Sequence, residues 1–170
     1  MPYYGAVGKA GRTVVARLRP GTDLMGGLKE LADAHKLKAA YIPVIIGGVD
    51  RAVIEVAKPS KDSPVGVVAK KIELTGPIAI CGAQGMICEL DNGDIEPHLH
   101  ITFVDSNGHI HGGHLEAGTA PVTTTADVIM QEVLDVKFGR GFDEDVKTTL
   151  FFPSQPLTDL RASVKGQTGR

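Results

Sequence analysis

The sequence has little cysteine and no long apolar run, and each absence narrows the class of protein. Only Cys81 and Cys88 occur among its 170 residues, which argues against a disulfide framework. Their apolar neighbours predict buried thiols in a reducing compartment. No stretch reaches the roughly 18 apolar residues of a membrane-spanning helix, and the N-terminal segment lacks the hydrophobic run of a signal peptide. We therefore expect a cytoplasmic protein with no membrane partner.

An excess of positive charge is also missing. The formal net charge of −2 predicts no broad electrostatic attraction to nucleic acid. The densest basic stretch is only Lys70-Lys71, and no Arg-Gly-Arg-Pro segment that could enter a DNA minor groove occurs. A Gly-x-Ser-x-Gly elbow is absent, and "GAVGKAGRT" breaks the spacing of a phosphate loop. DNA is therefore a disfavoured partner.

What the sequence does contain is an ordinary globular mixture, with 42% hydrophobic and 22% charged residues. Its length is the usual size of one domain. A first strand is predicted over Arg12–Gly21, followed by a helix that Thr22 or Asp23 caps. The predicted apolar stripe of this helix consists of Leu24, Leu28, Leu31 and His35.

Most of the remaining segments predict strands. Ala39–Ala57 has the pattern of two strands with a break at Gly47-Gly48. "VVAKKIELTG" and "PIAICGAQGMICEL" predict two more, the second apolar enough for the middle of a sheet. "TTTADVIMQEVLDV" is compatible with a helix or a strand. One helix among seven or eight strands predicts a single α+β domain built on a largely antiparallel sheet.

Five of the six histidines lie between Glu96 and Gly118, in two predicted strands joined by "SNG". A three-residue hairpin loop of this kind pairs His100 with His114. Residues that lie directly opposite each other point to the same face, and His98 lies two positions before His100. The turn therefore predicts that these three histidines converge.

Three imidazoles at this separation could form a tris-His metal site with an open position, the arrangement of catalytic zinc sites. The alternative is a polar, solvated hairpin whose histidines do no chemistry, and we adopt it for His109 and His111, which point to the other face. A two-residue Asn107-Gly108 turn would shift the register by one and remove His114 from the site.

The same register places Glu116 opposite His98. This makes Glu116 the candidate acid–base catalytic residue. The alternative is an ordinary carboxylate on the rim of a strand end.

The segment "GPIAICGAQGMICELDNGDIEPHLHITFVDSNGHIHGGHLEAG" resembles the core of the PPC domain, the plants-and-prokaryotes conserved domain. The order "H-L-H" and then "G-G-H-L" is the specific part. "RPGTDLMGGLKELADAHKLKAAYI" resembles the opening strand and helix of that family, and "FGRGFDEDVKTTLFFP" its last strand region. The resemblance covers roughly Arg12 to Pro153.

This resemblance implies an α+β domain that assembles as a homotrimer, with zinc ligands at His98, His100 and His114 as in bacterial members. Plant members carry AT-hooks and act as nuclear DNA-binding regulators. This sequence has no AT-hook and contains "TGPIAI" where plant members carry a Gly-Arg-Phe-type segment. The fold is also distantly similar to acetolactate decarboxylase, a zinc enzyme whose metal is held by a His-x-His pair and a later His.

The expected organisation is a PPC-like domain over residues 12–153, an N-terminal extension over 1–11 and a polar tail over 154–170. Two functional classes remain open. In the first, zinc or a similar divalent ion binds or transforms a small oxygenated, carboxylate-like molecule; an enzyme of this kind would be a lyase or a hydrolase. In the second, the protein is a DNA-associated regulatory scaffold with a structural metal.

Overall fold

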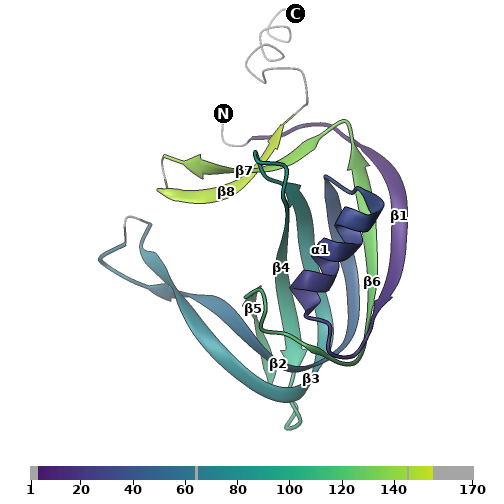
Figure 1. Cartoon of the computed structure of the whole chain (residues 1–170). Coiled ribbons are helices and arrows are strands. Elements are labelled where there is room, and N and C mark those ends of the chain that lie inside the picture. The colour runs from purple at the N-terminus through teal and green to yellow at the C-terminus, as the bar shows by residue number, and fades with distance from the viewer. Residues whose placement is uncertain (1–3, 64, 145, 155–170) are drawn as a thin grey trace, which may run out of the picture.

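A computed structural model describes residues 4–63, 65–144 and 146–154, which form eight strands and one helix (Figure 1). The elements are β1 (Lys9–Leu18), α1 (Leu24–His35), β2 (Ala40–Pro59), β3 (Val67–Glu89), β4 (Ile95–Val104), β5 (Ile110–Leu115), β6 (Val122–Leu134), β7 (Lys137–Asp143) and β8 (Thr148–Ser154). Six strands form one antiparallel sheet in the order β1-β6-β2-β3-β4-β5, and β7 pairs with β8 in a second sheet. The predicted α+β class is confirmed, although the strands divide between two sheets. Residues 155–170 of the predicted polar tail lie outside the described residues.

The helix forms where the sequence predicts it, but its buried face differs from the predicted stripe. Asp23 caps the helix by accepting a hydrogen bond from the amide of Gly26 at 2.8 Å. Its buried positions are Leu24, Met25, Gly27, Leu28 and Ala32. His35, predicted to end the apolar stripe, is instead an exposed last residue, because Ala32 completes the buried face at the i, i+4 spacing from Leu28.

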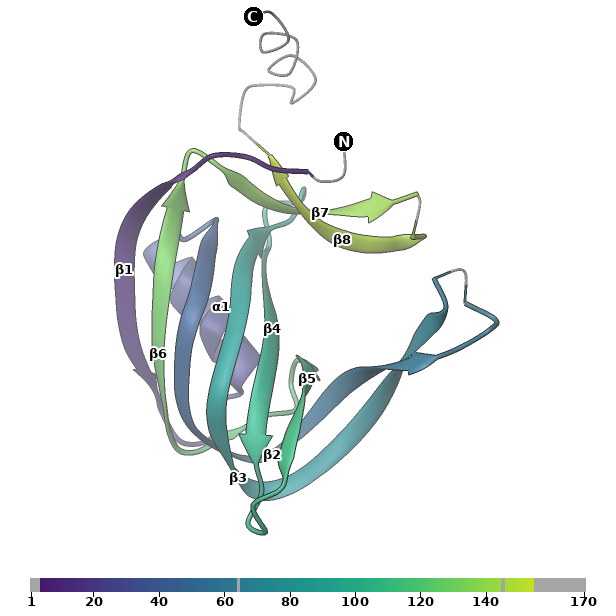
Figure 2. The same cartoon turned by 180° about the vertical axis from the view of Figure 1, so that it is seen from behind.

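The helix packs on one face of the six-stranded sheet, and the alternation along β4 determines which residues face away from it. Leu99, Ile101 and Phe103 are buried in the core with α1. Successive strand residues point to opposite faces. His98 and His100 therefore project from the open face of the sheet, opposite the helix. Figure 2 shows this face of the sheet, with α1 behind it.

Two strands are much longer than predicted. The expected break at Gly47-Gly48 is wrong, because β2 continues through both glycines to Pro59. A Cβ atom at Gly47 would overlap the carbonyl oxygen of Thr125 on β6, so glycine permits the close approach of the two backbones here. The two strands predicted after residue 66 are likewise one strand, β3.

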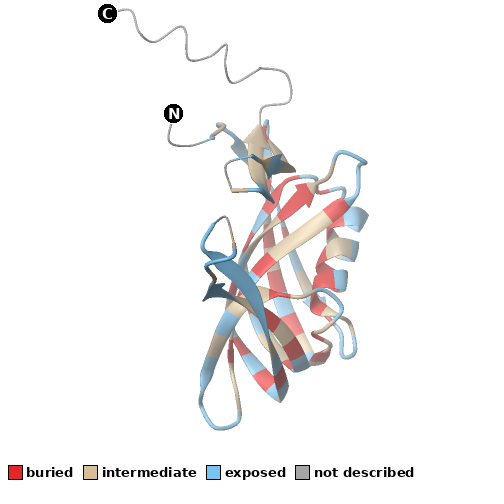
Figure 3. Cartoon of the chain, turned by 90° about the vertical axis from the view of Figure 1, so that its left-hand side faces the viewer, coloured by how far each residue is buried: buried red, intermediate tan, exposed pale blue. Residues whose placement is uncertain are grey.

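The C-terminal part of β2 (residues 51–59) pairs with the N-terminal part of β3 (residues 67–75) as a hairpin that we call the arm. In Figures 1 and 2 the arm projects from the body on the same side as the β7–β8 hairpin. Figure 3 shows that its outer part is largely exposed, in contrast to the buried strands behind it. The base of the arm pairs with β5 through Ile54–Leu115 and Glu55–His114.

The alternation of burial also explains the two cysteines. Cys88 is buried, and burial raises the pKa of its thiol to about 11. Cys81 is exposed, so the prediction of two buried thiols is wrong for this residue. Its apolar neighbour Ile80 points into the core, and Cys81 therefore points out. No helix among the described residues is long and apolar enough to span a membrane.

Candidate metal centre

The loop between β4 and β5 has the geometry that the sequence predicts. Asp105 accepts from the amide of Gly108 at 3.0 Å and donates its own amide to His109 at 3.1 Å. Gly108 has a φ of 83°, the left-handed conformation of a G1 bulge. The resulting register pairs Thr102 with Gly112 and His100 with His114. The predicted three-residue loop is confirmed, and the alternative two-residue turn is not formed.

This register brings His98, His100 and His114 together. Their ring centroids lie 5.3 Å (His98–His100), 4.7 Å (His98–His114) and 5.6 Å (His100–His114) apart. One nitrogen from each ring lies within 4.8 Å of the others. Nitrogens at about 2.1 Å from a tetrahedral zinc ion are about 3.4 Å apart, so small side-chain rotations would close the set around a metal. The donor set fits a divalent ion that prefers imidazole.

The environment keeps two of these rings neutral. Burial, followed by the nearby His114, Arg140 and His100, lowers the pKa of His98 to about 4. Burial, followed by His100, also lowers the pKa of His114, although the carboxylates of Glu55 and Glu96 oppose this shift. Metals bind the unprotonated imidazole nitrogen. Both rings are therefore in the neutral form that a metal can bind at neutral pH.

Three charged residues beside the histidines were not predicted. Glu55 pairs with His114 across β2 and β5, and residues in such a pair share a face. Glu96 precedes His98 by two positions on β4, so strand alternation alone could have identified it. Arg140 reaches the site from β7 and places Nη1 3.1 Å from His98 Nδ1. Glu55 and Arg140 reach the site only through contacts between segments that are distant in the sequence.

Glu116, the candidate acid–base residue, has a different partner from the one expected. The β4–β5 pairing ends at His100–His114, and β5 then pairs with β2, so Glu116 does not lie opposite His98 in the sheet. Its carboxylate accepts a hydrogen bond from Lys71 Nζ at 2.6 Å. Its acid–base role therefore stays a prediction.

His109 and His111 lie apart from the three converging histidines and share one carboxylate. His109 Nδ1 and His111 Nε2 each lie 3.1 Å from Asp105 Oδ2. Hydrogen bonds from His111 and from the His109 amide hold the pKa of Asp105 well below its usual range. These contacts connect the two ends of the hairpin loop. That His109 and His111 do no chemistry stays a prediction.

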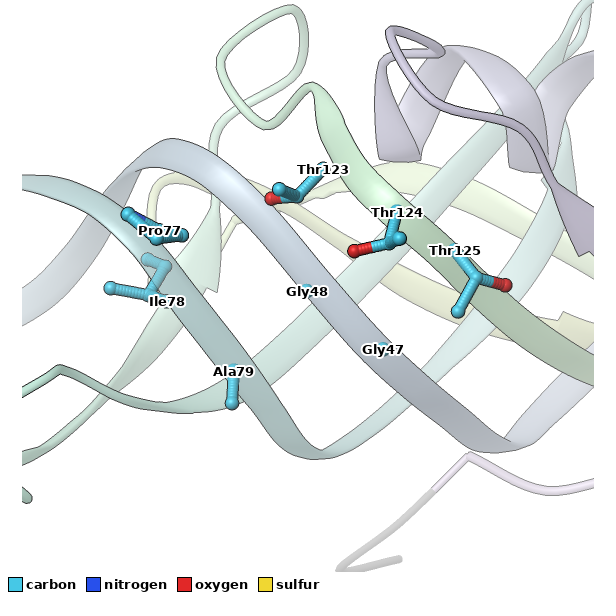
Figure 4. A pocket seen from close by; sticks show the side chains of 8 residues that line it. All are labelled: Gly47, Gly48, Pro77, Ile78, Ala79, Thr123, Thr124 and Thr125. Carbon is cyan, nitrogen blue, oxygen red and sulfur yellow. The ribbon is translucent and has the colours of Figure 1, made fainter.

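A shallow hollow of about 300 Å³ also lies on the sheet, between β2, β3 and β6 (Figure 4). Glycine, alanine, proline, isoleucine and threonine line it, among them Gly48, Pro77 and Thr124. None of these side chains is an acid, a base or a strong metal ligand near neutral pH. The histidines therefore offer the richer chemistry.

Known proteins share this fold. A metal-containing protein from Archaeoglobus fulgidus is 26% identical, with a TM-score of 0.73 over 89% of this chain and 99% of that chain. A plant- and prokaryote-conserved (PPC) protein from Pyrococcus horikoshii has a TM-score of 0.73 at 22% identity, over 91% of this chain and 100% of that one. A candidate DNA-binding protein from Bacteroides thetaiotaomicron has a TM-score of 0.68 at 15% identity, over 85% of this chain and 96% of that one. The last two show the fold alone.

The sequence also matches curated proteins and a family model. The bifunctional protein GlmU of a Synechococcus strain is 28% identical over 132 residues, which are 78% of this chain. The chain spans about a fifth of the length of the curated relatives that it matches. The family model of the Plants and Prokaryotes Conserved (PCC) domain matches residues 5–134. The chain therefore belongs to the Plants and Prokaryotes Conserved domain family, the PPC family of the sequence analysis.

Proposed function

We propose that His98, His100 and His114 hold zinc or a similar divalent metal, and that this site binds or transforms a small oxygenated, carboxylate-like molecule. The observation that carries the proposal is the convergence of three imidazole nitrogens within 4.8 Å on the open face of the sheet. The metal-containing relative from Archaeoglobus fulgidus supports it. Three protein ligands leave a coordination position for a water molecule or a substrate oxygen.

When bound, the metal would act as a Lewis acid on an oxygen at that position. The chain's own residues supply the surroundings. The carboxylates of Glu55 and Glu96 carry negative charge near His114 and favour a cation there. Glu116, held by Lys71, is the proposed acid–base group.

Metal removal tests the proposal. Protein purified without added chelator is expected to carry about one divalent ion per chain, as elemental analysis would show. A thermal-shift screen of small carboxylic acids should find stabilising compounds, because a ligand that binds only the folded state raises the midpoint of unfolding. Their effect should vanish after treatment with a chelator and return when zinc is added. Protein that neither carries nor takes up a divalent ion would refute the site.

The alternative, a DNA-associated scaffold, predicts a different surface. The densest basic stretch, Lys70-Lys71, lies on the arm, and Lys71 is bound to Glu116. Arg12 and Arg17 pair with Glu132 and Asp127. Neutralised cations contribute little to the phosphate attraction that DNA binding requires.

We therefore expect no sequence-selective binding of duplex DNA at physiological salt. A gel-shift titration with a random-sequence pool checks this expectation. Binding that is nanomolar, salt-sensitive and enriched for particular sequences would favour the scaffold instead.

A further inference from the structure

Arg140 is the unexpected neighbour of the three histidines. Its Nη1 lies 3.1 Å from His98 Nδ1, and its Nε lies 3.5 Å from Glu96 Oε1. The side chain is only 19% exposed, and the buried Nε makes no hydrogen bond to the described residues. A guanidinium has five N–H donors and no acceptor. The contact with His98 uses a terminal N–H group, so its loss would free that donor for another molecule beside the proposed metal site.

The contact with His98 and the capture of a metal exclude each other. Because the guanidinium can only donate, His98 Nδ1 must accept with a lone pair. A neutral imidazole has one such nitrogen, since the other carries the proton. If a metal takes Nδ1, it replaces Arg140 there. If it takes Nε2, the proton moves to Nδ1, which can then no longer accept from Arg140. In either case the metal releases the guanidinium from His98.

The released guanidinium would lie in a site whose net charge is positive once a divalent ion is bound. The positive charge of Arg140 and the negative charge of Glu96 cancel. The two negative charges of Glu55 and Glu116 exceed the single positive charge of Lys71 by one. A divalent ion then leaves one net positive charge among these groups. An anion with one charge and two oxygens matches this balance, since one oxygen can reach the metal and the other the guanidinium fork.

We infer that Arg140 binds the carboxylate group of the small ligand in the metal-loaded protein, and that metal capture by His98 frees it to do so. This inference rests on the proposed metal site. It assigns Arg140 two measurable effects: competition with the metal for His98 and recognition of the anion.

Cobalt(II), whose visible spectrum reports the ligands around it, serves as the metal probe, and sodium acetate serves as the anion probe. Ionic strength is held constant with sodium perchlorate. Arg140→Gln should bind cobalt about tenfold more tightly, because the competing charge-assisted hydrogen bond is gone. The same variant should require about tenfold more acetate for half of the spectral change. Arg140→Lys, which keeps the charge without the fork, should bind acetate with an intermediate affinity.

Lys137→Gln is the matched control, since it removes one charge from the same strand. Lys137 lies on β7 and pairs with Asp91 at 3.0 Å. It should leave both affinities unchanged. A structural role for Arg140 would lower the stability of the variants without opposite changes in cobalt and acetate binding.

The unaltered protein provides a second measurement that does not depend on how a variant folds. Nitrogen NMR of the side chains should show His98 Nδ1 as an acceptor without metal, and the Arg140 signals should shift when zinc is added. Cobalt and acetate affinities in Arg140→Gln equal to those of the unaltered protein would overturn the inference alone. Arg140 NMR signals that do not shift when zinc is added would do the same. Failure of the unaltered protein to bind cobalt would overturn the inference together with the metal site.

Discussion

Replacing His100 with alanine is expected to abolish metal binding. His100 contributes one of three converging nitrogens, and two imidazoles leave half of the coordination shell to water. We expect the affinity for zinc to fall by more than about a hundredfold. The side chain is exposed, so the metal-free fold should tolerate the change. Elemental analysis after gel filtration measures the loss, and the rise of the unfolding midpoint on zinc addition should disappear.

His109→Ala and His111→Ala are the matched controls, because they remove a histidine from the same hairpin. Both side chains contact Asp105 rather than the three histidines. They should retain metal at the level of the unaltered protein. A His100 variant with unchanged metal content would exclude the site, and metal loss in the His111 variant would place it on the other face.

The triad could be predicted because a local turn determines it. Ser106, Asn107 and Gly108 form a three-residue loop whose left-handed glycine leaves one register for the two strands. Once that register is set, strand alternation brings His98 onto the face of His100 and His114. Arg140 could not be predicted in this way, because β7 reaches β4 only through tertiary packing.

The errors in the predicted strand boundaries have the same origin. Gly47-Gly48 has the composition of a break, yet β2 continues because its backbone lies against Thr125 of β6. Residues 123–136 suited either a helix or a strand, and pairing with β1 and β2 makes most of them strand β6. Local patterns therefore predicted the helix and the β4–β5 turn, whereas strand length depended on neighbours distant in sequence.

The open face of the sheet carries exposed apolar side chains. Val15 is 73% exposed and Ile46 61%, and α1 covers the opposite face. The arm adds Val67 and Val68, also exposed. Two-stranded hairpins are marginally stable on their own, and exposed apolar patches mark association surfaces. These features support the predicted assembly, for which the family resemblance selects a trimer.

Light scattering coupled to gel filtration is expected to give about three times the chain mass of 17.9 kDa. Ile46→Asp should convert the trimer to monomers, because assembly would bury a carboxylate without a partner. Ile46 is already exposed in the single chain, so the fold should survive, as circular dichroism would show. Ala34→Asp, on the exposed side of α1, is the matched control and should remain trimeric. An unaltered protein that is monomeric at micromolar concentration would rule out the trimer. An Ile46→Asp variant that stays trimeric would place the interface elsewhere, because a closed symmetric contact through this face could not accommodate three buried carboxylates.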